Sequence, residues 1–433
     1  MECGVSKQSV RNLLEVGQGN EIAITAPNRK PLNYNGLRIH VDLIGEQLAS
    51  IGLKNSDRVA IVLPNGPEMA TAFLAVSSYM SAAPLNPSYK EAEYEFYLED
   101  LKPKLVIVEE NTSNPVVKAA KKLSIPIAKI SVDKDNAAGE FSLFETRKSI
   151  DIPSIEMEAL VLHTSGTTSR PKVVPLTQSN LVASAGNISD TLKLKEADHS
   201  LNIMPLFHIH GLIAVLCASI SAGSSVCCTP GFNALKFFEL ANSQKITWYS
   251  GVPTMHQAIL LRGQRQADVA KALNLRFIRS SSASLPPAVF DELTTLFNCP
   301  VIEAYGMTEA THQMSSNPLP PQKQKAGFVG LPAGPEVCIM DAAGNKLAEG
   351  EEGEVCIKGD NVTPGYDKNP EANSQSFTDG WFRTGDQGKF DEDGYLKITG
   401  RLKEIINRGG EKISPLEIDN VLMDHPAIQQ VVS

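Results

Sequence analysis

The chain has 433 residues, more than one compact core accommodates, so its length predicts two to four structural units. Its hydrophobic content of 42% and net charge of -9 are ordinary for a globular protein. They lack the basic excess typical of proteins that bind nucleic acids or membrane surfaces, so we expect neither as a partner.

Helical and strand patterns alternate through the first 150 residues. Apolar residues at helical spacing predict a helix over Leu37–Ile51, and the β-rich run Arg58–Leu63 predicts a strand, followed by a helix over Glu68–Met80. Further on we expect a strand at residues 104–108, a helix at 116–123, and strands at 160–163, 247–250, 276–280 and 301–304. This alternation predicts an α/β fold with a largely parallel sheet.

The pattern changes after about Ala326, where short strand segments are separated by turn signals. Asp-Gly between β-rich segments predicts hairpins at Asp379-Gly380 and Asp393-Gly394, and Glu352-Gly353 is a further turn signal. We therefore expect a small β-rich unit that ends near Gly400.

The last segment begins at Arg401, and Ser414-Pro415 predicts the start of a helix that reaches His425-Pro426. About thirty residues are too few to fold alone. Either a C-terminal domain is absent from this chain, or the segment packs on the main body.

A loop rich in small hydroxylated residues follows the strand expected at residues 160–163. It reads Thr164-Ser165-Gly166-Thr167-Thr168 and continues to Lys172. Backbone amides, hydroxyls and a lysine arranged in this way can hold an anion such as a phosphate, although the spacing is not that of a Walker motif. On these residues alone, a solvated polar loop is the alternative interpretation.

This loop resembles the phosphate loop of the adenylate-forming superfamily, which includes acyl-CoA synthetases, 4-coumarate ligases, luciferases and peptide-synthetase adenylation domains. Four more motifs match in the family's order: Pro205-Leu206-Phe207-His208, Tyr305-Gly306-Met307-Thr308-Glu309, Trp381-Phe382-Arg383-Thr384-Gly385-Asp386 and Gly400-Arg401-Leu402-Lys403-Glu404. The resemblance implies an AMP-binding domain over residues 1–400. It would contain α/β subdomains at 1–160 and 161–325, a β-barrel-like subdomain at 326–400, and a hinge with the start of a truncated C-terminal domain at 401–433.

The resemblance also implies an acid–thiol ligase that uses ATP, Mg²⁺ and coenzyme A. Such an enzyme brings two anions together and stabilises the charge that develops as pyrophosphate leaves. Thr164–Thr168 would hold the β- and γ-phosphates beside Lys172, Thr308 would bond the α-phosphate, and Glu309 would ligate Mg²⁺. Lys172, His208, Thr308 and Glu309 are the expected catalytic residues.

Other positions would contact the nucleotide and coenzyme A. Tyr305 would stack on adenine, and Asp386 and Arg401 would bond the ribose, although Asp386 alone also suits a turn. Gly409 and Gly410 match positions that lie against the pantetheine arm, and Lys403 matches the domain hinge; a surface lysine is its alternative interpretation. The remaining nucleotide positions are Ser281, Ser282, Ala283, Glu303, Ala304, Gly306 and Met307.

Two segments depart from the family's usual residues. Ser169 and Val173 replace glycines in the phosphate loop, so we expect a stiffer loop. Ser281-Ser282-Ala283-Ser284-Leu285 replaces the commoner Gly-Gly-Ala-Pro-Leu between adenine and the acyl pocket.

The acyl pocket is expected to be polar, lined by His208, Ser282 and His312. Hydroxyl and imidazole groups suit a second carboxylate, whereas fatty or aromatic chains need apolar walls. Residues 279–285, 308–320 and 407–415 look like the oxalate–CoA ligase branch, which implies oxalate or another small dicarboxylate as the acid. Each histidine alone suits a structural role equally well.

Other interpretations remain open. His208 and His210 would share a face of a strand as a metal pair, but no third ligand is evident. A peptide-synthetase domain would carry Phe-Asp where Phe232-Asn233 stands. A 4-coumarate-like or medium-chain ligase is one alternative, and a nucleotide-binding module inactive without its C-terminal domain is another.

Expectations about completeness and compartment follow. The family's adenylation lysine lies near the end of the C-terminal domain, beyond Ser433, so this chain should bind ATP or AMP but adenylate poorly. Seven scattered cysteines and the absence of an apolar signal core favour the cytoplasm, with a peroxisome as the alternative if a C-terminal signal follows. The longest apolar run, Leu212–Ile220, is far short of the ~20 residues of a membrane span and predicts a buried helix.

Overall fold

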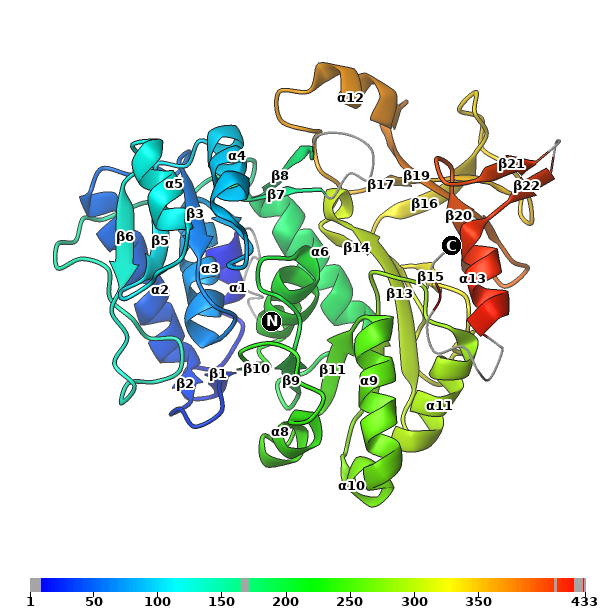
Figure 1. The fold of residues 1–433 in the computed structure, drawn as a ribbon, viewed down its shortest axis with the longest axis horizontal. Helices are drawn as coiled ribbons and strands as arrows, with labels where there is room; N and C mark the ends of the chain where they lie inside the picture. The colour runs from blue at the N-terminus through cyan, green and yellow to red at the C-terminus, as the bar shows by residue number, and fades with distance from the viewer. Residues whose placement is uncertain (1–8, 165–170, 409–410, 424–430, 432–433) are drawn as a thin grey trace, which may run out of the picture.

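The computed structural model describes residues 9–164, 171–408, 411–423 and 431 (Figure 1). Two large sheets flanked by helices and a smaller antiparallel sheet organise these residues. The mixed α/β architecture expected from the sequence is confirmed.

The first large sheet has the strand order β6-β5-β3-β4-β7-β8. All neighbours are parallel except β7 and β8, which form an antiparallel pair. The strands are β3 (Arg58–Val62), β4 (Ser81–Pro84), β5 (Leu105–Glu109), β6 (Ile127–Ile130), β7 (Glu158–His163) and β8 (Val173–Thr177).

Helices cover both faces of this sheet, which explains why its strands are nearly continuous apolar runs. Val59 and Ile61 of β3 belong to the core cluster that includes α3, whereas Ala60 and Val62 belong to the cluster formed with α4 and α5. The helices are α2 (Tyr34–Ser50), α3 (Pro67–Tyr79), α4 (Glu91–Leu101) and α5 (Val116–Lys122).

The second large sheet has the order β15-β14-β13-β12-β11-β9-β10-β1-β2. Its six central strands, from β13 to β1, are parallel, with antiparallel strands at both edges. The strands are β1 (Ile22–Thr25), β2 (Leu32–Asn33), β9 (His199–Asn202), β10 (Ser225–Cys228), β11 (Trp248–Gly251), β12 (Phe277–Ser280), β13 (Val301–Met307), β14 (His312–Ser316) and β15 (Leu331–Pro332).

A buried helical layer lies between the two large sheets and includes the expected helix at Leu212–Ile220. It consists of α6 (Gln178–Thr191), a π-helix (His210–Cys217) and α7 (Ala218–Ser221). The opposite face of the second sheet is covered by α8 (Phe237–Ser243), α9 (Pro253–Gly263), α10 (Ala267–Ala272) and α11 (Pro287–Phe297). Among the described residues, no helix combines the length and the apolar character needed to cross a bilayer.

The smaller sheet contains β16 (Glu336–Met340), β17 (Gly353–Lys358), β18 (Phe377–Thr378), β19 (Trp381–Phe390) and β20 (Leu396–Arg401), with α12 (Pro370–Ser376) beside it. The hairpin expected at Asp379-Gly380 joins β18 to β19, with φ of 50° and 78° at its two central residues. Gly353 is different from the expectation: it starts β17 instead of lying in a turn. A side chain there would meet Leu347 and the Met340 carbonyl within 2.6 Å.

The last described segment packs against the smaller sheet. It contains β21 (Ile406–Arg408), β22 (Glu411–Ile413) and α13 (Pro415–Met423), and α13 contacts β20. The subdomain boundaries stay predictions, but the strands interleave in space. β1 and β2 join the second sheet, and β7 and β8 complete the first.

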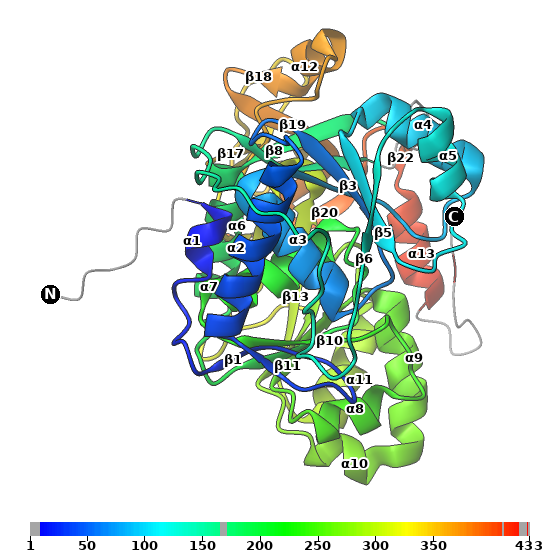
Figure 2. The same ribbon diagram turned by 90° about the vertical axis from the view of Figure 1, so that its left-hand side faces the viewer.

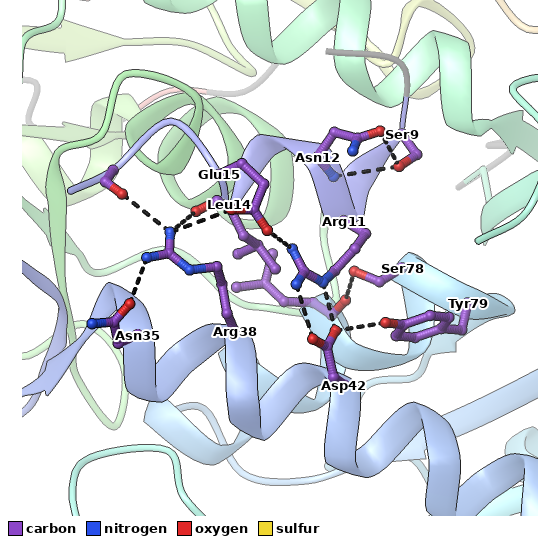
Figure 3. Close-up of polar contacts among 12 residues, drawn as sticks. Ser9, Arg11, Asn12, Leu14, Glu15, Asn35, Arg38, Asp42, Ser78 and Tyr79 are labelled. Atoms are coloured by element: carbon purple, nitrogen blue, oxygen red, sulfur yellow. Dashed lines mark hydrogen bonds and ion pairs between the residues drawn. The ribbon is translucent and has the colours of Figure 1, made fainter. Parts of the chain in front are cut away.

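A polar network fixes the short helix α1 (Val10–Leu13) on α2 and α3 (Figures 2 and 3). Arg11 forms a bidentate pair with Asp42 at 2.5 and 2.9 Å, and the Tyr79 hydroxyl donates to the same carboxylate at 2.6 Å. Desolvation raises the pKa of Asp42, but the hydrogen bonds from Arg11 and Tyr79 outweigh it and hold that pKa below its ordinary value. The carboxylate therefore joins three helices.

Candidate active site

The base of the candidate phosphate loop is held by β7 and β8. His163 and Val173 are paired across the two strands, and the Thr164 amide donates to the Lys172 carbonyl at 3.0 Å. Val173 therefore belongs to a strand and packs in the core instead of stiffening the loop. The candidate loop residues Ser165, Gly166, Thr167 and Thr168, together with Ser169, Gly409 and Gly410, lie outside the described residues.

Lys172, Glu309 and Tyr366 meet beside the start of β8. Glu309 lies in a 3-10 helix (Thr308–Ala310) directly after β13, and its carboxylate accepts a 2.8 Å hydrogen bond from the Tyr366 hydroxyl. The Lys172 ammonium lies 4.2 Å from the centre of the Tyr366 ring, a cation–π contact. Thr308 begins the same 3-10 helix and is partly exposed.

The protonation of these groups follows from burial. Desolvation raises the pKa of Glu309, against the opposing effects of the Tyr366 hydrogen bond and the Lys172 charge. Desolvation also lowers the pKa of Lys172; Glu309 opposes this and the exposed Lys403 adds to it. A carboxylate that is costly to bury as an anion is stabilised by a nearby cation, so Glu309 fits a divalent metal ion.

The candidate ribose residues bind one another in this structure. Asp386 and Arg401 are register partners across β19 and β20, and the Arg401 Nε lies 3.1 Å from the Asp386 carboxylate. The Tyr305 hydroxyl donates to the other carboxylate oxygen at 2.5 Å. Desolvation raises the pKa of Asp386, while Tyr305 and Arg401 oppose the rise. This arrangement links two motifs that are 81 residues apart in the sequence.

A cavity of about 270 Å³ lies beside these residues and collects most of the nucleotide positions expected from the sequence. The expected nucleotide residues that line it are Ser282, Ala283, Glu303, Ala304, Tyr305, Gly306, Met307, Asp386 and Arg401. Gly306 is required here, because a side chain would fall 1.8 Å from the His312 carbonyl oxygen.

Two expected nucleotide residues make internal contacts. Ser281 is buried and donates to the Ala304 carbonyl at 2.8 Å, which joins the serine segment to β13. Glu303 is also buried: one carboxylate oxygen accepts from the Leu285 amide, the other has no partner, and desolvation raises its pKa to about 8.

His208 and His210 do not lie on a strand, which corrects that expectation. His210 begins the π-helix, whereas His208 lies in the turn before it and is exposed. Two features favour a helix at this point. Gly211 packs closely on the preceding turn, where a Cβ atom would lie 2.4 Å from the Pro205 carbonyl oxygen, and a continuous buried apolar run follows it. Among the described residues, no group of three or more His, Cys, Asp or Glu side chains could hold a metal ion.

The expected acyl-pocket residues Ser282 and His312 both contact His210. The His210 Nδ1 lies 2.9 Å from the Ser282 hydroxyl, and the rings of His210 and His312 meet edge to face at 4.8 Å. Desolvation, then the charges of Arg279 and His208, lowers the pKa of both His210 and His312. His208 retains exposed surface, yet desolvation by the surrounding protein lowers its pKa as well.

Three residues around this pair had no expected role in the acyl pocket: Arg279, Ser250 and His210. Arg279 is fully buried, with guanidinium contacts to Ser250 at 3.4 Å and to Gln313 at 3.3 Å. The sequence did contain a signal for Arg279. It follows two strongly β-forming residues and precedes a serine run, and charged residues in a buried strand are uncommon.

The family model described as AMP-binding enzyme matches residues 15–367. An oxalate–CoA ligase of Arabidopsis thaliana is 45% identical over 95% of this chain and 84% of the relative, and one of Saccharomyces cerevisiae is 43% identical over 87% and 74%. A solved structure of o-succinylbenzoate coenzyme A synthetase (MenE) of Bacillus subtilis with ATP and magnesium aligns with a TM-score of 0.83. It is 28% identical, and the alignment covers 97% of this chain and 85% of MenE.

Proposed function

The chain belongs to the AMP-binding enzyme family and is an AMP-forming acid–CoA ligase, and we propose that its acid is oxalate or another small dicarboxylate. ATP, Mg²⁺ and coenzyme A are used in this reaction class. The observation that carries the proposal is the buried Arg279, which takes part in none of the ion pairs found among the described residues. A buried cation without a counter-ion is costly, and a bound dianion offsets that cost.

The polar groups around Arg279 support the same substrate class. Ser282 lines the cavity, and His210 connects it to both expected histidines: the His210 ring lies edge to face against His312, and the His210 amide donates to His208 Nδ1 at 3.3 Å. A fatty or cinnamic side chain would leave these groups desolvated without partners, at about 1–3 kcal/mol for each lost hydrogen bond. A second carboxylate supplies acceptors for them instead.

The phosphate end would activate the first carboxylate. Lys172 and Thr164 would hold the β- and γ-phosphates, Thr308 the α-phosphate, and Glu309 the metal ion, with Tyr366 orienting the Glu309 carboxylate. The metal would supply charge stabilisation as pyrophosphate leaves. These residues bring the phosphate chain and the acid together, which is the larger part of catalysis in phosphoryl chemistry.

The nucleotide and thiol residues complete the proposal. Tyr305 would lie against adenine, with Asp386 and Arg401 exchanging their mutual contact for the ribose hydroxyls. Lys403, Gly409 and Gly410 would serve the thioester step. We keep the cytoplasm as the proposed compartment because the six cysteines of the described residues are free thiols.

The proposal is tested on protein that includes the C-terminal domain, by ATP–pyrophosphate exchange with a panel of acids at equal concentration. Oxalate should support the fastest exchange, followed by malonate, with hexanoate and cinnamate near background. Exchange with hexanoate or cinnamate and none with oxalate would disprove the substrate assignment while leaving the ligase class intact.

A further inference from the structure

A chain of hydrogen bonds leads from the buried Arg279 to the cavity. The Arg279 guanidinium contacts the Ser250 hydroxyl at 3.4 Å, and that hydroxyl lies 2.6 Å from His210 Nε2. On the other side of the ring, His210 Nδ1 lies 2.9 Å from the hydroxyl of Ser282, which lines the cavity. Arg279, Ser250 and His210 are all fully buried, so water does not compete for these contacts.

The donors and acceptors of this chain have a fixed direction. Arginine can only donate, so the Ser250 oxygen accepts from it. If His210 also donated to Ser250, the hydroxyl hydrogen of that buried serine would have no acceptor among its contacts in the described part of the chain. A buried unpaired hydroxyl costs about 1–3 kcal/mol. Ser250 therefore donates to Nε2, and His210 carries its single proton on Nδ1.

The last contact then determines what Ser282 does. Because His210 Nδ1 donates, the Ser282 oxygen accepts, and the serine hydrogen is left free for a substrate acceptor at the border between the nucleotide cavity and the His210–His312 pair. Ser282 has a φ of 72°, a conformation that favours glycine, and the family usually has glycine in this segment. The bond from His210 holds the serine in that strained conformation.

We propose that Arg279 is a positioning residue that acts through Ser250 and His210 to make Ser282 an obligate hydrogen-bond donor toward the second carboxylate of the acyl substrate. The inference rests on the proposed function, because it names the group that recognises a dicarboxylate. In this proposal the buried Arg279 has two roles. Its charge favours a bound anion nearby, and its N–H groups set the direction of the hydrogen bonds from Ser250 to Ser282.

The direction is tested without turnover by nitrogen-15 NMR of protein labelled in histidine, with the His210 signals identified by their absence in His210→Asn. The wild-type protein should show a neutral His210 ring protonated on Nδ1 from pH 6 to 8. A ring protonated on Nε2, or a charged ring, overturns the inference. This readout is independent of the acid, so it separates failure of the inference from failure of the proposed function.

The kinetic arm uses three variants. Arg279→Met and Ser250→Ala should each raise the KM for oxalate about 10- to 100-fold, the size expected for one charge-assisted hydrogen bond, with the KM for ATP changed less than about twofold. Arg279→Lys keeps a donor-only cation and should recover part of the affinity. If Arg279→Met does not fold, Ser250→Ala breaks the chain with a smaller change. An unchanged KM for oxalate in a folded Ser250→Ala protein contradicts the inference.

Discussion

The Tyr366 hydroxyl donates a 2.8 Å hydrogen bond to the buried Glu309 carboxylate, while the same aromatic ring lies under the Lys172 ammonium. One side chain thus joins the candidate metal ligand to the candidate phosphate lysine. Neither contact follows from the sequence motifs, because Tyr366 lies 57 residues beyond Glu309.

Replacing Tyr366 with phenylalanine should lower kcat about 10-fold and raise the Mg²⁺ concentration needed for half-maximal rate. The ring that supports Lys172 remains, but the Glu309 carboxylate loses its orienting donor, and one hydrogen bond to a charged group is worth about 1.5–3 kcal/mol. Tyr34→Phe is the matched control, since Tyr34 is a buried tyrosine that donates to the Ser224 carbonyl elsewhere. Equal losses in the two variants would indicate a stability effect only.

Replacing Asp386 with asparagine should raise the KM for ATP about 10- to 100-fold with little change in the KM for the acid. The asparagine amide accepts hydrogen bonds only through its single carbonyl oxygen. It therefore cannot accept from both ribose hydroxyls and also from Arg401. Isothermal titration with AMP measures the same loss without turnover. A KM for ATP within twofold of wild type would remove Asp386 from the nucleotide site.

Replacing Glu303 with glutamine should stabilise the protein at alkaline pH. The folded pKa of Glu303, about 8, exceeds its unfolded value, so the folded state binds the extra proton. Its contribution to the free energy of unfolding therefore falls by about 1.4 kcal/mol per pH unit between roughly pH 4.3 and 8. The variant should lose this fall, which thermal unfolding at pH 5, 7 and 8.5 would reveal. Parallel curves for the two proteins would contradict the assignment.

Replacing Asp42 with asparagine should destabilise the N-terminal contact at neutral pH, and this loss should shrink at acid pH. The folded pKa of Asp42 is depressed, so its contribution is present above the unfolded pKa and is lost as the pH falls through the folded one. Because the carboxylate is 39% exposed, roughly 1 kcal/mol is expected after solvent screening. Asp135→Asn, on an exposed turn, should change the unfolding free energy at neither pH.

The elements with a clear hydrophobic period were predictable from the sequence. The helix expected at Leu37–Ile51 is α2, and the buried run Leu212–Ile220 is helical, because apolar spacing and length alone determine burial of this kind. The interleaving of the two large sheets was not predictable, since β1 pairs with β10, about 200 residues further on. Pairing at such separation depends on tertiary packing, which no local pattern encodes.

Some residues of the candidate site were predictable from the sequence and others were not. Asp386, Arg401 and Tyr305 were expected together and do contact one another, because ordered motifs carry that information. Arg279 and Ser250 were missed, because each is a single residue in a β-rich run and its partner comes from another strand. His210 was considered only for a metal pair, and the π-helix that turns it toward Ser282 has no signal in the residues.

The most direct measurement of the central claim is a competition assay with mass-spectrometric detection. Enzyme that includes the C-terminal domain is incubated with ATP, Mg²⁺, coenzyme A and equal concentrations of oxalate, malonate, hexanoate and cinnamate, and the thioesters are quantified. Our account predicts that oxalyl-CoA is the main product and that its yield falls about 10-fold or more in Arg279→Met. A product mixture dominated by the hexanoyl or cinnamoyl thioester would contradict it.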